Sequence, residues 1–404
     1  MAYVRRTKFA LGESVTTVER NRLAIDGGAP VRDHPIVTTV PPTAADVAAA
    51  AAVLRSGRLG GPEHPETHRF EAELAAFGEV PHAVAVNSGT AAIHAILAGL
   101  GVGPGDEVIV PAHTFIASAT PVLMVGAKPV VVDVDDSTYC IDPAAAAAEV
   151  TRRTKAIVAV HINGHPAPVD RLPSGIPVVS DACQAHGAAL GGVPVAALGA
   201  AAAFSFWQDK LMTTGGEGGA LLTADPAIAE AANLLRSHGL RQIPGSRDFH
   251  HPVLGYNYRL TGPQSAMGRS QLSRLPEMLA VRRRNARKLI EALDGIAGIT
   301  PPVVRPGARH VFWKFVIAVD PEQFTVDVRG FMRALAAEGV PAAPRYPVAL
   351  HKQPVLSSGR LAACPVAESL SSRLLTVALP ATEQDDDVAD VAEAVRKVAT
   401  ALRR

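Results

Sequence analysis

Short β-type apolar runs alternate with longer helical patterns between residues 83 and 224 of this 404-residue chain. Several of these runs are apolar on consecutive residues, as expected of strands that are buried on both faces. Strands of this kind form a mostly parallel sheet that helices cover, so the alternation predicts an α/β fold. The predicted strands are Ala83–Val86, Glu107–Val110, Pro129–Val134, Ala156–Val160, Pro177–Ser180, Ala202–Phe206 and Gly219–Thr223, and the predicted helices are Thr90–Leu100, Ile116–Met124 and Ala144–Val150.

The pattern changes after Asp225, where long helical segments dominate. From about Arg309 onward we predict a smaller α+β unit. Its last helix should begin after Thr382, because a threonine N-cap followed by Asp385 in the first turn suits the helix dipole. The elements predicted in this half are helices at Pro226–Ser237, Pro276–Leu293 and Val326–Glu338 and a strand within His310–Val319.

Composition and charge exclude several classes of function. Lys and Arg number 39 against 38 Asp and Glu, a formal net charge of +1, so no general basic field exists to hold nucleic acid or a membrane surface. The three cysteines (Cys140, Cys183 and Cys364) show no CxxC spacing, so we expect no disulfide framework and no metal site. Together with the absence of a recognisable secretory signal, this predicts a reducing, cytoplasmic environment.

One uncharged stretch, from His186 to Gln208, is long enough to raise the question of a membrane span. Its residues are mostly Gly, Ala and Pro rather than Leu, Ile or Phe. We therefore interpret it as buried protein core.

Three segments carry residues that suit chemistry, and the first is Val86-Asn87-Ser88-Gly89-Thr90. It ends a predicted strand and opens a predicted helix, where free backbone N–H groups can bind an anion such as phosphate. Ser and Thr are also ordinary helix caps, so a purely structural interpretation stays open.

The second segment is Ser180-Asp181-Ala182-Cys183-Gln184-Ala185-His186-Gly187, directly after the apolar run IPVV. An acid at the carboxyl end of a buried parallel strand lies where open α/β sheets bind their ligands. Because an unpaired buried carboxylate is costly, Asp181 should face a cation or a protonated heterocycle. The alternative is an aspartate that caps the following helix.

The third segment runs from Phe204 to Gly219 and contains Lys210 in a loop rich in Gly and Thr. A Walker loop would have its glycines before the lysine and Ser or Thr directly after it, whereas Leu211 follows here. A lysine that forms an imine with an aldehyde cofactor explains the segment better.

Taken in order, the segments SGT, PGDEVIVPAHTFIASA, GAKPVVVDVD, SDACQAHGA, FSFWQDKLMTTGGEGG and LGYNYRLT make the chain resemble the DegT/DnrJ/EryC1/StrS aminotransferases. These are pyridoxal 5′-phosphate enzymes that aminate keto-sugars and keto-cyclitols. The resemblance implies a fold-type I architecture and a homodimer with shared active sites. The implied parts are an N-terminal extension (1–23), a large cofactor-binding domain with a seven-stranded sheet (24–275) and a small α+β C-terminal domain (276–404).

The resemblance also implies roles for particular residues. Lys210 would be the Schiff-base lysine, and Asp181 would pair with the protonated pyridine nitrogen of the cofactor. Phe115 would stack on the cofactor ring, and Gln184 would hydrogen-bond its phenolic oxygen. The phosphate would be held by Ser88, Gly89, Thr90 and Ser205, with Asn257 reaching across from the partner subunit.

Substrates and products follow from the resemblance only in outline. It implies glutamate or glutamine as amino donor, a keto-sugar or keto-cyclitol as acceptor, and a place in antibiotic or other secondary metabolism. The alternative within the same fold is a lyase, dehydratase or aromatising synthase without net amino transfer. Candidate substrate contacts are Tyr256, Arg259, His310, Trp313, Lys314, Arg345, Tyr346 and His351, each of which could equally be a surface or interface residue.

Overall fold

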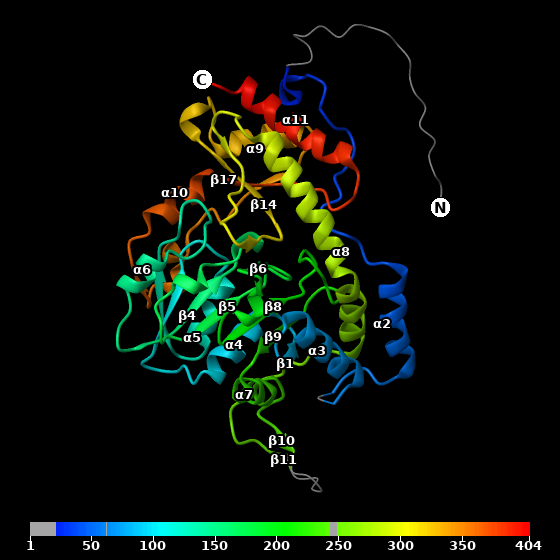
Figure 1. Cartoon of the computed structure of the whole chain (residues 1–404), viewed down its shortest axis with the longest axis vertical. Coiled ribbons are helices and arrows are strands. Elements are labelled where there is room, and N and C mark those ends of the chain that lie inside the picture. Colours follow the sequence, from blue (N-terminus) through cyan, green and yellow to red (C-terminus); the bar gives the residue numbers. More distant parts are fainter. Residues whose placement is uncertain (1–21, 62, 243–248) are drawn as a thin grey trace.

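A computed structural model describes residues 22–61, 63–242 and 249–404 of the chain (Figure 1). Its largest element is an eight-stranded sheet with the order β1-β9-β8-β5-β4-β2-β3-β16. β9 runs antiparallel to both of its neighbours, and the other adjacent pairs are parallel. The strands are β1 (His82–Val86), β2 (Glu107–Pro111), β3 (Lys128–Val132), β4 (Thr154–Val160), β5 (Val178–Asp181), β8 (Ala201–Ser205), β9 (Gly219–Thr223) and β16 (Arg360–Leu361).

The predicted α/β fold with a mostly parallel sheet is confirmed, and each of the seven predicted strands is present. The eighth strand, β16, was not predicted. It consists of only Arg360 and Leu361, which pair with Val130 and Val131 at the edge of the sheet. Two residues of mixed polarity carry no periodicity, so sequence patterns cannot reveal such a strand.

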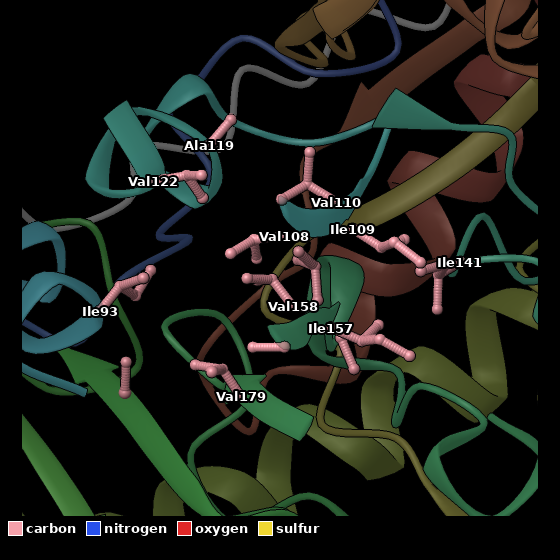
Figure 2. Packing of buried hydrophobic residues seen from close by; sticks show 14 of the residues in the cluster. Ile93, Val108, Ile109, Val110, Ala119, Val122, Ile141, Ile157, Val158 and Val179 are labelled. Atoms are coloured by element: carbon pink, nitrogen blue, oxygen red, sulfur yellow. The ribbon is translucent and has the colours of Figure 1, made fainter. Parts of the chain in front are cut away.

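Both faces of the large sheet are buried, which explains its continuously apolar strands. Along β8, Ala201 and Ala203 belong to one buried cluster, and Ala202 and Phe204 belong to another. The first cluster includes α4 (Gly89–Gly99), α5 (Thr120–Met124) and α7 (Pro226–Arg236), and the second includes α3 (Pro65–Gly78) and α8 (Gly262–Leu293). Figure 2 shows the first cluster, in which side chains of α4 and α5 lie over those of β2, β4 and β5.

A smaller antiparallel sheet, with the order β12-β14-β17-β15, forms the C-terminal unit. Its core also includes the second half of α8 and two residues from near the start of the described chain, Leu23 and Ile36. Its elements are β12 (Ile299–Thr300), β14 (Phe315–Val319), β15 (Ala342–Pro344), β17 (Leu374–Val377), α9 (Val328–Ala337) and α11 (Asp385–Ala401).

The remaining elements lie around these two sheets (Figure 1). They are α2 (Ala44–Ser56), α6 (Pro143–Ala148), α10 (Pro365–Arg373), a small sheet of β13 (Ala308–Arg309), β6 (Ala189–Leu190) and β7 (Val193–Pro194), and a hairpin of β10 (Arg241–Gln242) and β11 (Phe249–His250). The uncharged stretch from His186 to Gln208 forms β6, β7 and β8 and is mostly buried, as interpreted. Within the described part of the chain, every helix is too short or too polar to span a bilayer.

Two predicted helices have different bounds. The helix expected at Ile116–Met124 is divided into a 3-10 turn (Ile116–Ser118) and α5. Pro121 has no N–H to donate to the preceding turn, so a new helix begins beside it, where that N–H is not needed. The helix expected to begin at Pro276 instead begins at Gly262 and continues through Pro276. The sequence signal of this earlier start, which we missed, is the capping box between Thr261 and Gln264.

Two further predictions in the C-terminal unit were inaccurate. Only Phe315–Val319 of the segment His310–Val319 is a strand, because Phe312 adopts a positive φ of 51° that breaks extended geometry. Thr382 is not the N-cap of α11, which is Gln384; the Thr382 hydroxyl instead donates to Asp387 at 3.2 Å. Acidic residues do occupy the first turn, as expected.

The proposed division into domains stays a prediction. The N-terminal extension (1–23) lies almost entirely outside the described residues, and the boundary at residue 275 falls inside the continuous helix α8.

Candidate active site

The carboxyl ends of β1, β5 and β8 meet at one edge of the large sheet, and the candidate residues follow these ends. Ser88 comes two residues after β1, Asp181 ends β5 and Ser205 ends β8. Carboxyl ends of parallel strands are where open α/β sheets bind ligands. The topology therefore brings together residues as distant in the sequence as Ser88 and Ser205, which are 117 positions apart.

The N-terminus of α4 forms one wall of this site. Ser88 is its N-cap and accepts a hydrogen bond from the Ala91 N–H at 3.1 Å. The N–H groups of Gly89 and Thr90 have no acceptor among the described residues, as is usual at the start of a helix. Two free donors and the helix dipole suit an anion such as a phosphate.

Gly89 allows this helix end to lie directly against the sheet. A Cβ at position 89 would stand 2.6 Å from the Cys183 Sγ and 2.9 Å from the Ser205 Cβ. No side chain fits there without displacing Cys183 or the end of β8. This close approach explains the glycine in the SGT segment.

We predict that Gly89→Ala lowers the free energy of unfolding by about 1–3 kcal/mol, the usual cost of overpacking. It should also weaken phosphate binding, because the start of α4 must move away from the sheet. Chemical denaturation measures the first effect, and titration with pyridoxal phosphate measures the second. The matched control is Gly103→Ala, whose Cβ would meet nothing within 4 Å. Equal behaviour of the two variants would contradict the proposed packing role.

Asp181 lies 4% exposed at the end of β5. Its Oδ2 accepts a hydrogen bond from the Ser118 hydroxyl at 2.6 Å, and its Oδ1 accepts one from the Cys183 N–H at 3.2 Å. Among the described residues it forms no ion pair. A buried carboxylate without a cation is costly, so this site suits a positively charged ligand group.

Lys210 lies in the loop that joins β8 to β9. Its Nζ stands 3.7 Å above the ring of Trp313, and the Trp313 indole N–H donates to the Asp209 carbonyl at 2.6 Å. Burial lowers the pKa of Lys210 from 10.5 to about 8; Cys183 and Asp181 oppose this shift, while Arg345 and Lys314 add to it. The amine is therefore available at near-neutral pH, as a nucleophile or a base requires.

The lowered pKa predicts how Lys210 reacts with pH. In the cofactor-free protein, labelling of Lys210 by acetic anhydride should rise with a midpoint near pH 8, because only the free amine reacts. Mass spectrometry of the Lys210 peptide measures the midpoint. The same peptide in the unfolded chain should have a midpoint near 10.4. A midpoint shared by the folded and unfolded chains would show that burial does not act on this amine.

Gln184 lies 3% exposed in a network with the C-terminal unit. Its Oε1 accepts hydrogen bonds from the Asn163 N–H at 2.8 Å and from Arg345 at 3.0 Å. Its Nε2 donates to the Tyr346 hydroxyl at 3.1 Å. These contacts fix the orientation of the Gln184 amide, which lies three residues after Asp181 in the chain.

Phe115 and the GYNYR segment lie on the exposed side of this edge. Phe115 follows β2, and its side chain is 58% exposed. The exposed Asn257 contacts Asn87 of the same chain, whose Nδ2 lies 3.5 Å from the Asn257 carbonyl. Tyr256 stacks on Tyr258 with ring centroids 5.0 Å apart. The backbone of Arg259 forms an isolated antiparallel β-bridge with Val86.

Only two of the eight candidate substrate residues line a cavity beside Lys210. Trp313 and Lys314, together with Lys210, line a cavity of about 220 Å³ between the lysine loop and the smaller sheet. His310 and His351 do not line it: His310 is buried against Phe312, and His351 pairs with Glu368 at 2.8 Å. The cavity wall does not include Asp181 or the start of α4.

Sequence reasoning missed several residues at this site. Ser118 donates to Asp181, Asn163 contacts both Gln184 and Arg345, and Thr38 and Arg282 line the cavity. Asn163 could have been found, because it follows the apolar run of β4 at the same edge of the sheet. Thr38 could not, since it lies far from the other residues in the sequence.

The chemistry of these residues fits pyridoxal phosphate. Asp181 has no cationic partner among the described residues, and a protonated pyridine nitrogen would provide one. The free N–H groups at the start of α4 suit the phosphate. Lys210, with its lowered pKa, suits the aldehyde. Three separate features of one small molecule thus have a matching group at the same edge of the sheet.

Comparisons with known proteins agree with this fit. The profile of the DegT/DnrJ/EryC1/StrS aminotransferase family matches residues 43–396. A dTDP-3-amino-3,4,6-trideoxy-alpha-D-glucose transaminase of Streptomyces venezuelae is 38% identical over 87% of this chain and 91% of its own. An L-glutamine:2-deoxy-scyllo-inosose aminotransferase of Streptomyces kanamyceticus is 37% identical over 94% of this chain and 97% of its own. The crystal structure of DesV from S. venezuelae, in complex with a ketimine intermediate, superposes with a TM-score of 0.81 at 37% identity and covers 88% of this chain and 94% of DesV.

Proposed function

The chain belongs to the DegT/DnrJ/EryC1/StrS aminotransferase family, and from this premise we propose that it transfers an amino group from L-glutamate or L-glutamine to a keto-sugar or keto-cyclitol. Its cofactor is pyridoxal phosphate. The observation that carries the proposal is the meeting of Lys210, the unpaired Asp181 and the free end of α4 at one edge of the sheet. The product would be an amino sugar or aminocyclitol of secondary metabolism, such as part of an antibiotic.

Asp181 and Gln184 have complementary tasks in this proposal. When bound, pyridoxal phosphate supplies a protonated pyridine ring that delocalises the negative charge left on the substrate carbon. Asp181 keeps the pyridine nitrogen protonated, because an adjacent carboxylate favours the charged form. The hydrogen bond from Ser118 holds that carboxylate in place. Gln184 would hydrogen-bond the phenolic oxygen of the cofactor, and Phe115 would cover its ring.

Lys210 performs the proton transfer. Its Nζ removes the proton from the α-carbon of the donor amino acid, which requires the free amine. Burial favours that amine by lowering the pKa to about 8. Ser88, Gly89, Thr90 and Ser205 would hold the phosphate of the cofactor and so orient the substrate toward Lys210.

We also propose that two copies of the chain form a homodimer with shared active sites. Apolar side chains that remain exposed beside the site support this, since a second copy would cover them. They include Phe115 at 58%, Trp207 at 37% and Leu254 at 78% exposure. In the dimer, Asn257 of each subunit would contact the phosphate in the other.

The deciding experiment separates amino transfer from other chemistry of the fold. The purified, cofactor-loaded protein is mixed with L-glutamine or L-glutamate, and the released 2-oxo acid is quantified before acceptors are screened. We expect one equivalent of 2-oxoglutaramate or 2-oxoglutarate per site, followed by amination of a keto-sugar or an inosose. Dehydration or aromatisation of a sugar-derived substrate without release of an oxo acid would favour the lyase alternative and contradict the proposal.

A further inference from the structure

Trp313 covers the amine of Lys210, and one arginine holds the segment that carries this tryptophan. Nε and Nη2 of Arg282 donate hydrogen bonds to the backbone carbonyls of Phe312 and Trp313, at 2.8 and 2.9 Å. Its Nη1 donates to the Thr38 carbonyl at 2.9 Å. From this arrangement we propose that Arg282 is a positioning residue that holds Trp313 over Lys210. The catalytic use of Lys210 rests on the proposed function, whereas the position of Trp313 does not.

The guanidinium of Arg282 acts as a clamp on backbone rather than as half of an ion pair. It projects from the second half of α8 and forms no ion pair with a described residue. Burial lowers the pKa of Arg282 from 12.5 to about 10. Hydrogen bonds from a desolvated cation to carbonyl oxygens are strong, and the planar guanidinium fixes the directions of its three nitrogens. A lysine at this position would keep the charge but could not hold all three carbonyls.

The clamped segment bends sharply at Phe312, and the bend is supported on both sides. Phe312 has a φ of 51°, in the left-handed region that residues with a Cβ rarely adopt. Its N–H donates to the His310 Nδ1 at 2.9 Å, and its carbonyl accepts the bond from Arg282. Such a conformation persists only where the surrounding contacts determine it. Loss of Arg282 would therefore release the side of the bend that leads to Trp313.

The bend directs the Trp313 side chain toward the lysine loop. The Lys210 Nζ lies 3.7 Å from the centre of the Trp313 ring, and the indole N–H donates to the Asp209 carbonyl at 2.6 Å. The ring excludes water from one side of the amine, and burial is the main cause of the lowered pKa of Lys210. The ring also attracts the protonated amine, but desolvation is the larger effect for a buried lysine. The other titratable groups that act on this amine are Asp181, Cys183, Arg345 and Lys314.

Arg282 lines the cavity beside Lys210, so it could instead be a receptor for an anionic substrate. Its contacts argue against this role, because each of its three guanidinium nitrogens already donates to a carbonyl. Two of the segments that it binds, at Thr38 and Trp313, are themselves walls of the cavity. Arg282 therefore shapes the cavity through those walls.

The first test measures the position of Trp313 directly. The chain has two tryptophans, so Trp207→Phe leaves Trp313 as the only one. In this background, quenching of Trp313 fluorescence by acrylamide is compared between the parent, Arg282→Met and Arg282→Lys, with the cofactor bound and after its removal. The control is Arg287→Met, which removes an exposed arginine from the same helix. Melting temperatures establish that each variant folds, and Arg282→Gln replaces Arg282→Met if the latter does not.

We expect acrylamide to quench Trp313 several-fold more strongly in Arg282→Met than in the parent, where this side chain is only 6% exposed. Arg282→Lys should be quenched nearly as strongly as Arg282→Met, because it keeps the charge but loses the planar fork. Arg287→Met should match the parent. Unchanged quenching in Arg282→Met, or full rescue by Arg282→Lys, would overturn the proposal.

The second test asks whether Arg282 acts on Lys210 through Trp313. The pH midpoint of Lys210 labelling by acetic anhydride is measured in the cofactor-free protein for wild type, Arg282→Lys, Trp313→Ala and the double variant. Each single substitution should raise the midpoint from near 8 by about 1 unit or more, toward that of an unburied lysine. The double variant should match Trp313→Ala, because without the indole Arg282 has nothing to position. Additive shifts would show that Arg282 acts on Lys210 independently and would overturn the proposal.

Neither test depends on turnover. If wild type releases no oxo acid from glutamine or glutamate, the proposed function fails. The quenching and labelling measurements still decide whether Arg282 positions Trp313 over Lys210.

Discussion

Replacing Lys210 by alanine is expected to abolish transamination and the visible absorbance that arises from covalent attachment of the cofactor. Two effects combine in this variant. The protein loses its nucleophile toward the aldehyde, and it loses the base for proton transfer, which alone contributes about 10²–10⁴-fold to the rate. The measurements are the absorbance spectrum of the purified variant and the release of oxo acid from glutamine and glutamate.

The control for this prediction is Lys155→Ala, which removes an exposed lysine at the other end of β4. It should retain both colour and activity. Borohydride reduction of wild type should attach the cofactor to the peptide that contains Lys210 and to no other. Normal turnover in Lys210→Ala, or a label on a different lysine, would refute the assignment.

Replacing Asp181 by asparagine is expected to leave the cofactor bound but to lower turnover by about 10²–10⁴-fold. The amide has nearly the same shape, so it can still accept a hydrogen bond from Ser118, as the carboxylate does at 2.6 Å. A neutral group cannot hold the pyridine nitrogen in its charged form. Cofactor content and single-turnover rates with the donor amino acid measure the two effects separately.

Asp294→Asn is the control, because Asp294 is an exposed residue at the end of α8. It should match wild type in both cofactor content and rate. Turnover near the wild-type rate in Asp181→Asn would mean that another residue protonates the ring. Loss of cofactor from that variant would instead make Asp181 a binding residue only.

The sequence by itself was sufficient for seven of the eight strands of the large sheet, and it singled out two residues as candidates for the site. Each predicted strand of the large sheet is a continuously apolar run, and burial on both faces requires such runs wherever the sheet forms. Asp181 was singled out because it directly follows one of these runs, and Lys210 because it lies in a loop of Gly and Thr that is unlike a solvated surface. In both cases the signal is local, so neighbouring residues are enough to reveal it.

The bounds of the less regular elements depended on contacts that no local pattern records. The helix that we expected to begin at Pro276 extends back to Gly262, and the strand expected within His310–Val319 begins only at Phe315, after the positive φ of Phe312. β16 is held only by its pairing with β3. Tertiary packing outweighs intrinsic propensity in such segments.

Arg345 shows most clearly what the sequence alone could not establish. In the sequence it is one of eight polar or aromatic candidates for substrate contact, and nothing distinguishes it from His310 or His351. The fold brings it to Gln184 and Asn163, 161 and 182 positions away in the chain, and leaves its charge without an acid among the described residues. Strand positions and the lysine loop follow from local hydrophobic and conformational preferences. Which charges remain unpaired at the site depends on how the segments that follow β4, β5 and β15 meet, and only the tertiary structure decides that.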